Sequence, residues 1–497
     1  MIVVDDPAAA PTIQAGAVVE EPRVDAKAKV TGQAQYCEDL PDLPGAVYGV
    51  AIRSPYAHAR LRSVDASAVE GMSGVLGVIH PGNLEELHLH FDPDTTDQIF
   101  IALHNKARYD GDLLGMVAAV DRRTAELAVE AMDIAYEPLP PIFSPEEALA
   151  PDAPLIHEQA GTNVAIDDLL IWGEIDRGLA EADRIFEETY FSQSVSHHPM
   201  EPSCSFVVNF RPELLEFWVP TNNAFWLADA AVKLFGIPLE RIRTRVPYVG
   251  GNFGGKDTCI EALIAAALSR KVQRPVRVIA SAQDSFRVAA RHAMTWKARI
   301  GVKDDGTLTA MDVDLKIDTG AYYTAAGIAT RNALTAAFGA YRVPHLRVRT
   351  VTCYTNKTPA GTFRNTGKSQ TTFGTDCAID NIARQMGFDP IEFRLKNTYG
   401  LGETVGPATW NLSGEQVAAP KPLDSDVHEM IRRAMSAMGW ERDESQNSKF
   451  KIQNGRLAYG RGLALSLRRG SATGEAEALA TADETGTIHI SHNAPEV

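Results

Sequence analysis

The chain has 497 residues, which is enough for more than one domain and a large hydrophobic core. Its 45% apolar and 23% charged residues are ordinary for a soluble globular protein, and no apolar run approaches the ~18 residues of a membrane span. The net charge of −16 argues against nucleic acid or an anionic membrane surface as a binding partner.

Residues 1–22 predict a disordered tail. They include Asp5 and Asp6 and lack the basic segment that begins a secretory signal peptide. Residues 23–150 then predict a small α/β domain, because segments of strand type alternate with a helical segment. The strands are expected at Val47–Ile52, Val75–Ile79 and Met116–Val120, and the helix at Thr124–Met132.

Residues 151–420 form the second predicted unit, which begins in a loop-like stretch after the prolines at 138–141. Gly236 is expected to end one of its helices, as glycine commonly does. Asp305-Gly306 has the composition of a hairpin turn. The expected helices are Ile175–Ala182, Ala224–Leu234 and Phe373–Met386, and the expected hairpin strands are Trp296–Val302 and Thr307–Ile317.

Residues 421–497 predict the start of a further domain that is incomplete. A helix is expected at Asp426–Met438, followed by a polar linker and by strands at Leu463–Leu467 and Thr487–Ser491. The whole chain therefore predicts an α+β protein, with a small α/β N-terminal domain, a mixed α/β domain and the beginning of a second such domain.

The loop Gly250–Asp257 is the most informative segment. A strand-like run, Ile242–Val249, precedes it, and a helix-like run, Thr258–Leu268, follows it. The first backbone N–H groups of a helix lack partners and carry partial positive charge, and glycines let the backbone approach a ligand closely. The pattern predicts a site for a phosphorylated or oxyanionic ligand.

Two other interpretations of this loop remain open. Gly250, Gly255 and Lys256 fit a phosphate-binding loop of nucleotide hydrolases, but Asp257 stands where Ser or Thr would bind magnesium. A carboxylate there would repel the phosphates of a nucleotide, which disfavours this class. The loop is otherwise a glycine-rich turn that only packs a helix on a strand.

Direct metal ligation by side chains of this chain is not expected. His197, His198 and Glu201 suggest zinc, but adjacent histidines point in different directions and no third ligand follows at zinc spacing. The five cysteines lack a C-x-x-C pair, so the chain predicts neither an iron–sulfur site nor a disulfide framework. Reduced cysteines are typical of a cytoplasmic protein, and an electron-relay cluster is expected on another chain.

The glycine loop resembles that of the molybdenum hydroxylases, the xanthine dehydrogenase and aldehyde oxidase family. Further segments are similar to motifs of this family and occur in the same order, from about Arg23 to Val497. They are Arg23–Gly32, Arg53–Arg60, Tyr136–Pro140, His198–Pro202 and Gly361–Gln370. The resemblance implies a hammerhead-like domain over 23–150, a molybdopterin-binding domain over 151–420 and the start of a second one over 421–497.

The resemblance also implies which residues contact the cofactor. The Gly254 N–H is expected to donate to an oxo ligand on the molybdenum, and Asn222 stands where the family usually has a Gln whose amide contacts such a ligand. Asn222 is otherwise a helix cap, a role that Asn favours. The implied cofactor contacts are Asn222, Gly251, Phe253, Gly254, Arg364 and Gln370, the last two near the pterin.

Three positions are implied to face the substrate. Asp257 replaces a Glu of the xanthine-oxidising branch, although an acidic residue at a helix N-terminus is also stabilised by the helix dipole. Thr366 replaces an aromatic ring that stacks on purines in that branch. Arg331 lies near a second Arg used by purine oxidisers, or else is an ordinary surface Arg.

The implied reaction is hydroxylation of an N-heteroaromatic compound or an aldehyde, with oxygen from water and a carboxylate as the base. The cofactor would be molybdenum–molybdopterin or its cytosine dinucleotide form, with 2Fe-2S and FAD on partner subunits. No residue of this chain aligns with the catalytic base of the family. We therefore expect a split subunit, completed by a second molybdopterin-binding chain, or a truncated one.

Two rival classes are set against this interpretation. A carbon monoxide-oxidising relative would carry a Cys in the loop near Gly361–Gly367, and this chain has none there. A non-catalytic cofactor-binding or assembly scaffold is the alternative if the base-bearing half is never supplied. A neighbouring gene that encodes the second half would separate the two.

Overall fold

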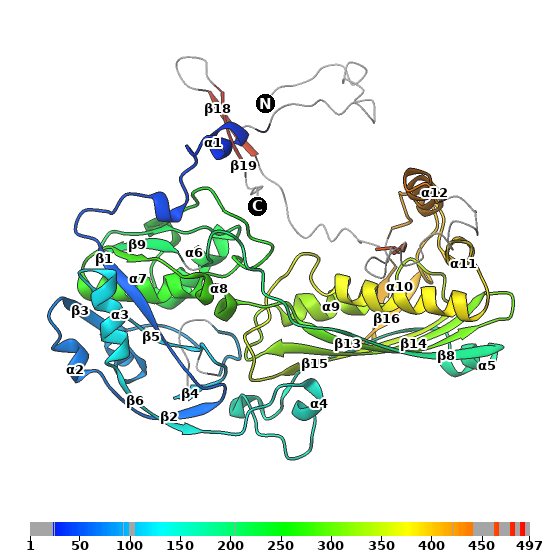
Figure 1. The fold of residues 1–497 in the computed structure, drawn as a ribbon, viewed down its shortest axis with the longest axis horizontal. Coiled ribbons are helices and arrows are strands. Elements are labelled where there is room, and N and C mark those ends of the chain that lie inside the picture. Colours follow the sequence, from blue (N-terminus) through cyan, green and yellow to red (C-terminus); the bar gives the residue numbers. More distant parts are fainter. Residues whose placement is uncertain are drawn as a thin grey trace, which may run out of the picture.

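The computed structural model describes residues 23, 25–92, 94–98, 105–203, 205–419, 421–440, 462–466, 478–482 and 488–492. The predicted tail over residues 1–22 and the predicted linker after Trp440 lie outside the described residues. Figure 1 shows two lobes side by side, each built on its own large sheet. None of the helices described in these ranges is both long enough and apolar enough to cross a bilayer.

The first lobe contains a seven-stranded sheet that joins two distant parts of the chain. Strand β1 pairs in parallel with β12, with Val47 opposite Val276, so strands from both sides of Ala150 share one sheet. The domain boundary expected near Ala150 therefore separates segments that fold together. The strand order is β11 (Ile242–Arg245), β10 (Leu214–Trp218), β9 (Phe206–Arg211), β12 (Val276–Val278), β1 (Val47–Arg53), β5 (Leu113–Ala119) and β3 (Val75–Ile79).

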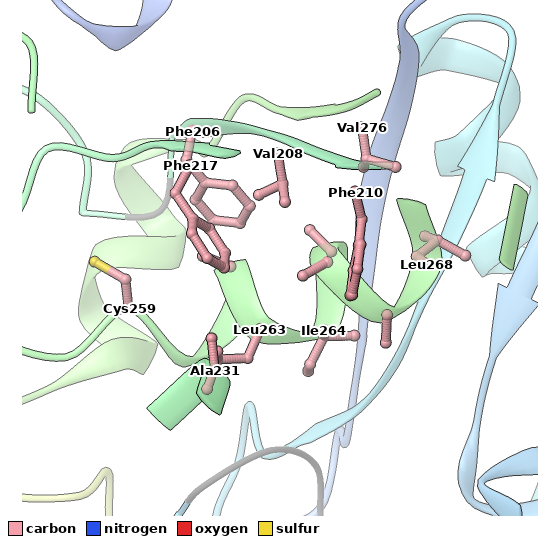
Figure 2. Packing of buried hydrophobic residues seen from close by; sticks show 14 of the residues in the cluster. Phe206, Val208, Phe210, Phe217, Ala231, Cys259, Leu263, Ile264, Leu268 and Val276 are labelled. Carbon is pink, nitrogen blue, oxygen red and sulfur yellow. The ribbon is translucent and has the colours of Figure 1, made fainter. Parts of the chain in front are cut away.

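Helix α7 (Ile260–Val272) fills the core of this lobe. Every residue from Ile260 to Ser269 is buried, and Figure 2 shows Leu263, Ile264 and Leu268 of this helix in one apolar cluster with Phe206, Val208 and Phe210 of β9. Strand β5 is buried along its whole length, because α7 packs against one face of the sheet and α3 (Arg122–Glu130) against the other. Burial of these apolar faces, at roughly 25 cal/mol per Å², stabilises the helix that follows the glycine loop.

A small three-stranded sheet and four further helices complete the first lobe. The sheet brings two of the family-like motifs together, since the Tyr56 and Tyr136 rings lie 5.0 Å apart and Pro140 O accepts a hydrogen bond from His58 Nδ1 at 2.7 Å. Its strands are β4 (Lys106–Ala107), β2 (Ala59–Asp65) and β6 (Asp133–Pro138). The helices are α1 (Ala26–Val30), α2 (Ser67–Glu70), α6 (Ala224–Phe235) and α8 (Ala282–Val288).

The second lobe has another seven-stranded sheet, and α9 and α10 lie along one face of it (Figure 1). Its strand order is β17 (Glu415–Ala418), β16 (Thr409–Leu412), β7 (Val164–Trp172), β15 (His345–Tyr354), β14 (Leu308–Gly320), β13 (Ala293–Val302) and β8 (Arg184–Ser192). Its helices are α4 (Pro145–Ala148), α5 (Ile175–Ala180), α9 (Ala326–Ala336), α10 (Lys368–Gln385), α11 (Pro390–Asn397) and α12 (Val427–Ala437).

Most predicted elements are confirmed, including the β13–β14 hairpin and helices α6 and α12. Strand β11 is shorter than predicted and ends at Arg245, because its partner β10 runs out at Trp218 and Pro220 has no N–H to continue the ladder. Helix α10 begins earlier than predicted, at Lys368, where the hydroxyl of Thr371 bonds back to the carbonyls of the first turn.

The C-terminal strand predictions have mixed outcomes. Strand β19 (Ile488–His492) confirms the second prediction, and it pairs with β18 (Ala478–Ala482). The first prediction is wrong over residues 463–466, which have no regular structure, and Leu467 lies outside the described residues. A strand needs a hydrogen-bonded neighbour, and the described part of the chain places none beside residues 463–466.

Candidate functional site

Three loops meet where the two lobes join. The glycine loop Gly250–Asp257 leads from β11 toward α7, residues 193–203 follow β8, and residues 355–367 lead from β15 to α10. The glycine loop and the last of these are joined directly, since Arg364 N donates to Phe253 O at 2.9 Å. The site is thus assembled from segments of both lobes.

The backbone of the glycine loop requires its glycines. Gly251 and Gly254 have φ angles of 96° and 98°, in the region that favours glycine. A Cβ on Gly254 would lie 2.5 Å from Thr362 O, and one on Gly250 would lie 2.4 Å from Glu201 Cβ. Phe253 also has a positive φ, 57°, and the residue is 48% exposed. The loop therefore holds a strained, closely packed conformation beside an open surface.

The side chain of Asn252 organises the N–H groups of this loop. Its Oδ1 accepts from Gly254 N and from Lys256 N, each at 2.9 Å. The N–H groups of Gly251, Asn252 and Phe253 take part in none of the hydrogen bonds found among the described residues. Three successive backbone donors are thus left for a ligand, an arrangement that binds anions.

This pairing changes which amide is available. The Gly254 N–H, predicted to donate to an oxo ligand, already donates to Asn252 Oδ1 in this structure. The free donors precede it by one to three positions in the loop. The structure does support another role for Gly254, because the absence of a side chain lets it approach Thr362 closely.

Lys256 and Glu201 form a buried ion pair beneath the loop. Lys256 Nζ lies 2.7 Å from Glu201 Oε2, and their side chains are 0% and 7% exposed. The lysine therefore points into the protein and not toward an anion above the loop, unlike the lysine of a phosphate-binding loop. That interpretation of Gly250–Lys256 is wrong for this structure.

The two adjacent histidines have separate structural partners. His197 Nε2 lies 2.6 Å from Thr362 O, and its ring packs 4.5 Å from that of Phe363. Burial lowers the pKa of His197, which favours the neutral ring. The ring of His198 lies 4.7 Å from that of Phe286. No group of three or more potential metal-ligating His, Cys, Asp or Glu side chains occurs among the described residues.

Asn222 lies close to the glycine loop, as the predicted role requires. Its neighbour Thr221 donates its hydroxyl to Lys256 O at 2.7 Å. The Oδ1 atom of Asn222 is buried and has no hydrogen-bond partner among the described residues. Asn223 occupies the N-cap position of α6, so the alternative of Asn222 as the helix cap is not what the structure shows.

Asp257 and Thr366 are both engaged by the protein itself. Thr362 donates its hydroxyl to Asp257 Oδ2, while Asp257 Oδ1 is buried without a partner among the described residues. Thr366 Oγ1 accepts from Phe363 N at 3.1 Å, which closes the turn before α10. Both residues therefore lie at the junction of the two loops, and Asp257 keeps one carboxylate oxygen unpaired.

The remaining predicted residues lie around this junction. Gln370 is buried on α10 and donates to His292 O at 3.1 Å, and the backbone of Arg364 is tied to Phe253 while its side chain is exposed. Arg331 is exposed on α9, and none of the hydrogen bonds or ion pairs of the described residues joins its side chain to the three loops. Its predicted place beside the substrate gains no support from this geometry.

Sequence reasoning did not assign the roles that three residues have in building the site. Asn252 arranges the loop amides, Glu201 holds the lysine, and Thr362 connects the two loops. The presence of Asn among glycines was an available signal for the first, because an Asn side chain often bonds to backbone N–H groups two residues on. The roles of Glu201 and Thr362 depend on contacts between segments far apart in the sequence.

Two family models match this chain. Residues 156–398 match the molybdopterin cofactor-binding domain, and residues 31–140 match the a/b hammerhead domain of aldehyde oxidase and xanthine dehydrogenase. A probable xanthine dehydrogenase subunit of Bacillus subtilis is 34% identical over 76% of this chain, which spans 50% of that protein. The nicotinate dehydrogenase large molybdopterin subunit of Eubacterium barkeri is 29% identical over 84% of this chain and 96% of its own length.

The fold is similar to a solved structure as well. The aldehyde oxidoreductase from Desulfovibrio gigas superimposes with a TM-score of 0.78 at 24% identity, covering 94% of this chain and 51% of that one. The chain therefore spans about half the length of this enzyme and of the Bacillus relative. The structural likeness supports the fold alone, and the sequence matches carry the family assignment.

The residues present fit the expected cofactor. Molybdopterin carries a phosphate and the molybdenum carries oxygen ligands, and both need hydrogen-bond donors. The backbone N–H groups of Gly251, Asn252 and Phe253, which have no partner among the described residues, would provide them. Phe253 is exposed and Gly251 partly so, whereas Asn252 is buried. The matched domain contains the three loops that build this site. The chain belongs to the molybdenum hydroxylase family of xanthine dehydrogenases and aldehyde oxidases, and carries the molybdopterin-binding domain of its large subunit.

Proposed function

We propose that this chain is the cofactor-binding part of a molybdenum-dependent hydroxylase that oxidises an N-heteroaromatic compound or an aldehyde. The observation that carries the proposal is the strained glycine loop at the junction of the lobes, with three backbone donors free above a buried ion pair. The names of the relatives, a xanthine dehydrogenase subunit and a nicotinate dehydrogenase subunit, support the substrate class.

The residues of this chain would bind and orient the cofactor. The N–H groups of Gly251, Asn252 and Phe253 would donate to its anionic oxygens, without the cost of ordering a flexible loop. Gln370 and Arg364 would lie on the pterin side. When bound, the cofactor supplies the means to insert oxygen from water into a carbon–hydrogen bond and to accept the two electrons released.

The substrate would lie against the exposed residue Phe253 and near the carboxylate of Asp257, whose Oδ1 is buried and has no partner among the described residues. An apolar ring beside a single charged acceptor suits a flat heterocycle with one N–H group, since the ring supplies stacking and the carboxylate orients the molecule. Asp257 is held in place by Thr362, so its position would not depend on the substrate. These roles make Asp257 an orienting group and not the base that abstracts the proton.

We further propose that the chain works in a complex in the cytoplasm. Both sequence relatives are named as subunits. Electrons would pass to 2Fe-2S and FAD groups on partner subunits, and a second molybdopterin-binding chain would supply the catalytic base.

The experiment that tests this proposal is isolation of the native complex through an affinity tag on this chain. We expect mass spectrometry to find iron–sulfur and flavin subunits, and metal analysis to find molybdenum. The complex should reduce a dye acceptor with nicotinate, xanthine, quinoline or an aldehyde as electron donor. A complex that contains no molybdenum, or that reduces the dye with none of these compounds, contradicts the proposal and favours a scaffold.

A further inference from the structure

Glu201 contacts both ends of the glycine loop. Its Oε2 accepts from Gly250 N at 2.7 Å at the start of the loop, and from Lys256 Nζ at 2.7 Å near its end. Its own N–H donates to Gly250 O at 3.2 Å. The carboxylate of Glu201 therefore fixes the distance between Gly250 and Lys256, the two ends of the segment that contains the three free amides.

The ion pair is buried, and this gives the contact its strength. The exposed fractions of the two side chains are 0% for Lys256 and 7% for Glu201. Charges withdrawn from water attract each other strongly at short range, and neither can leave the pair without a large desolvation penalty. The Lys256–Glu201 pair is thus a rigid support and does not exchange its partner for a ligand.

The second oxygen of Glu201 extends the support to the N-terminal part of the chain. Oε1 accepts from Cys37 N at 3.3 Å, and Arg277 holds the same segment through the carbonyls of Cys37 and Glu38. Residues 37–38, Glu201 and the glycine loop are therefore joined through a single side chain. All three segments lie within the first lobe or at its edge.

We propose that Glu201 is a positioning residue that sets the conformation of the glycine loop, and that Lys256 is its buried counter-ion and not a ligand-binding group. This inference rests on the proposed function in one respect, since the ligand of the loop is taken to be the molybdenum cofactor. The support itself is a property of the cofactor-free protein. It follows that the amides of Gly251 to Phe253 are oriented before the cofactor arrives.

The test uses Glu201→Gln, Lys256→Met and the double variant in the full chain with its partner subunits. Each single change leaves one buried charge without its counter-ion, so we expect the thermal midpoint to fall in both. The double change removes both charges, so the midpoint should recover. The buried pair Arg394–Asp376, with side chains 1% and 4% exposed, supplies the matched control as Arg394→Met with Asp376→Asn.

Two measurements separate positioning from a purely stabilising role. Hydrogen exchange of residues 250–257 in the cofactor-free protein should be faster in the double variant and unchanged in the control. Molybdenum content should fall by roughly 10-fold to 100-fold in the double variant, the range seen when groups behind a metal site are removed. The control pair should keep its molybdenum.

A double variant with normal exchange over residues 250–257 overturns the inference, whatever its molybdenum content. If the double variant does not fold, Glu201→Asp is used in its place, because it keeps the negative charge on a side chain that is one methylene shorter. Faster exchange of the loop in that variant supports the inference, and normal exchange overturns it. Failure of the proposed function looks different, since wild-type protein would then contain no molybdenum while the exchange result still stands.

Discussion

Thr362 and Asp257 connect the loop before α10 to the loop before α7 by a hydrogen bond from the Thr362 hydroxyl to Asp257 Oδ2. The same hydroxyl oxygen lies 3.0 Å from Gly254 O. Since α10 belongs to the second lobe and α7 to the first, this contact fixes a carboxylate of one lobe against the other. The position of Asp257 is therefore set by the junction between the lobes.

Replacing Thr362 by Val removes this hydroxyl while keeping the shape of the side chain. A hydrogen bond to a charged group contributes about 1.5–3 kcal/mol, so the specificity constant for the preferred substrate should fall by roughly 10-fold to 100-fold. Steady-state kinetics of the assembled complex measure this. Thr335→Val is the matched control, because that hydroxyl bonds to Arg331 O on α9 and should leave the kinetics unchanged.

Gly254→Val should abolish cofactor binding while the protein stays folded. The new Cβ would meet Thr362 O at 2.5 Å, and the φ angle of 98° disfavours any side chain. We expect metal analysis to show little molybdenum in the purified variant, with a circular dichroism spectrum like that of the wild type. Gly414→Val controls for backbone strain alone, because Gly414 has a φ of 93° and open space around it. Full molybdenum content in Gly254→Val would refute the role of the close approach.

Xanthine should be a poor substrate. Thr366 stands where purine oxidisers have an aromatic ring, and its hydroxyl is turned toward Phe363 N. Loss of stacking removes about 0.5–1.5 kcal/mol, and Asp257, which is shorter than the Glu of purine oxidisers, removes a well-placed hydrogen bond to a purine of about 1 kcal/mol. These terms lower the rate for a purine by about one to two powers of ten. A substrate panel in which xanthine has the highest specificity constant would show this reasoning to be wrong.

Ionisation of the buried Asp112 carboxyl should lower the free energy of unfolding as the pH rises. Its carboxylate is fully buried, and burial raises its pKa to about 6, although Arg108 N and the Tyr322 hydroxyl donate to it. The unfolded chain ionises near the usual pKa of 3.8, so the stabilising effect of the protonated form is present below that pH and is lost between there and pH 6.

The variant Asp112→Asn cannot ionise and should lack this dependence. The difference in unfolding free energy between wild type and variant should shift by an amount on the order of 3 kcal/mol between pH 4 and pH 7, in favour of the variant at the higher pH. Thermal midpoints of both proteins at several pH values measure it. A constant difference across this range would exclude a raised pKa at Asp112.

Local signals in the sequence predicted much of the fold. Gly236 ends α6 in the left-handed conformation, and Gly306 closes the β13–β14 hairpin with a φ of 84°, both as their sequences indicate. The position of the glycine loop between a strand and a helix was also predictable. These features depend on residues within a few positions of one another, which is the range over which propensity and turn chemistry act.

Contacts between distant segments could not be predicted in this way. Nothing near Val47 indicates that it pairs with Val276, because strand pairing depends on the burial of both strands against α7. The site shows the same limit. The Gly254 N–H was the expected donor, yet Asn252 Oδ1 takes it, and the competition between an internal acceptor and a ligand is decided by three-dimensional geometry.

The parallel pairing of β1 with β12 has a consequence for synthesis on the ribosome. Of the strands in the first sheet, β1, β3 and β5 emerge early, and β1 then forms an uncovered edge until residues 276–278 have left the exit tunnel. Such an edge is open to pairing with other chains. Folding of this lobe during synthesis therefore cannot finish until β12 has been made. Chaperone binding before that point would protect the nascent chain from aggregation.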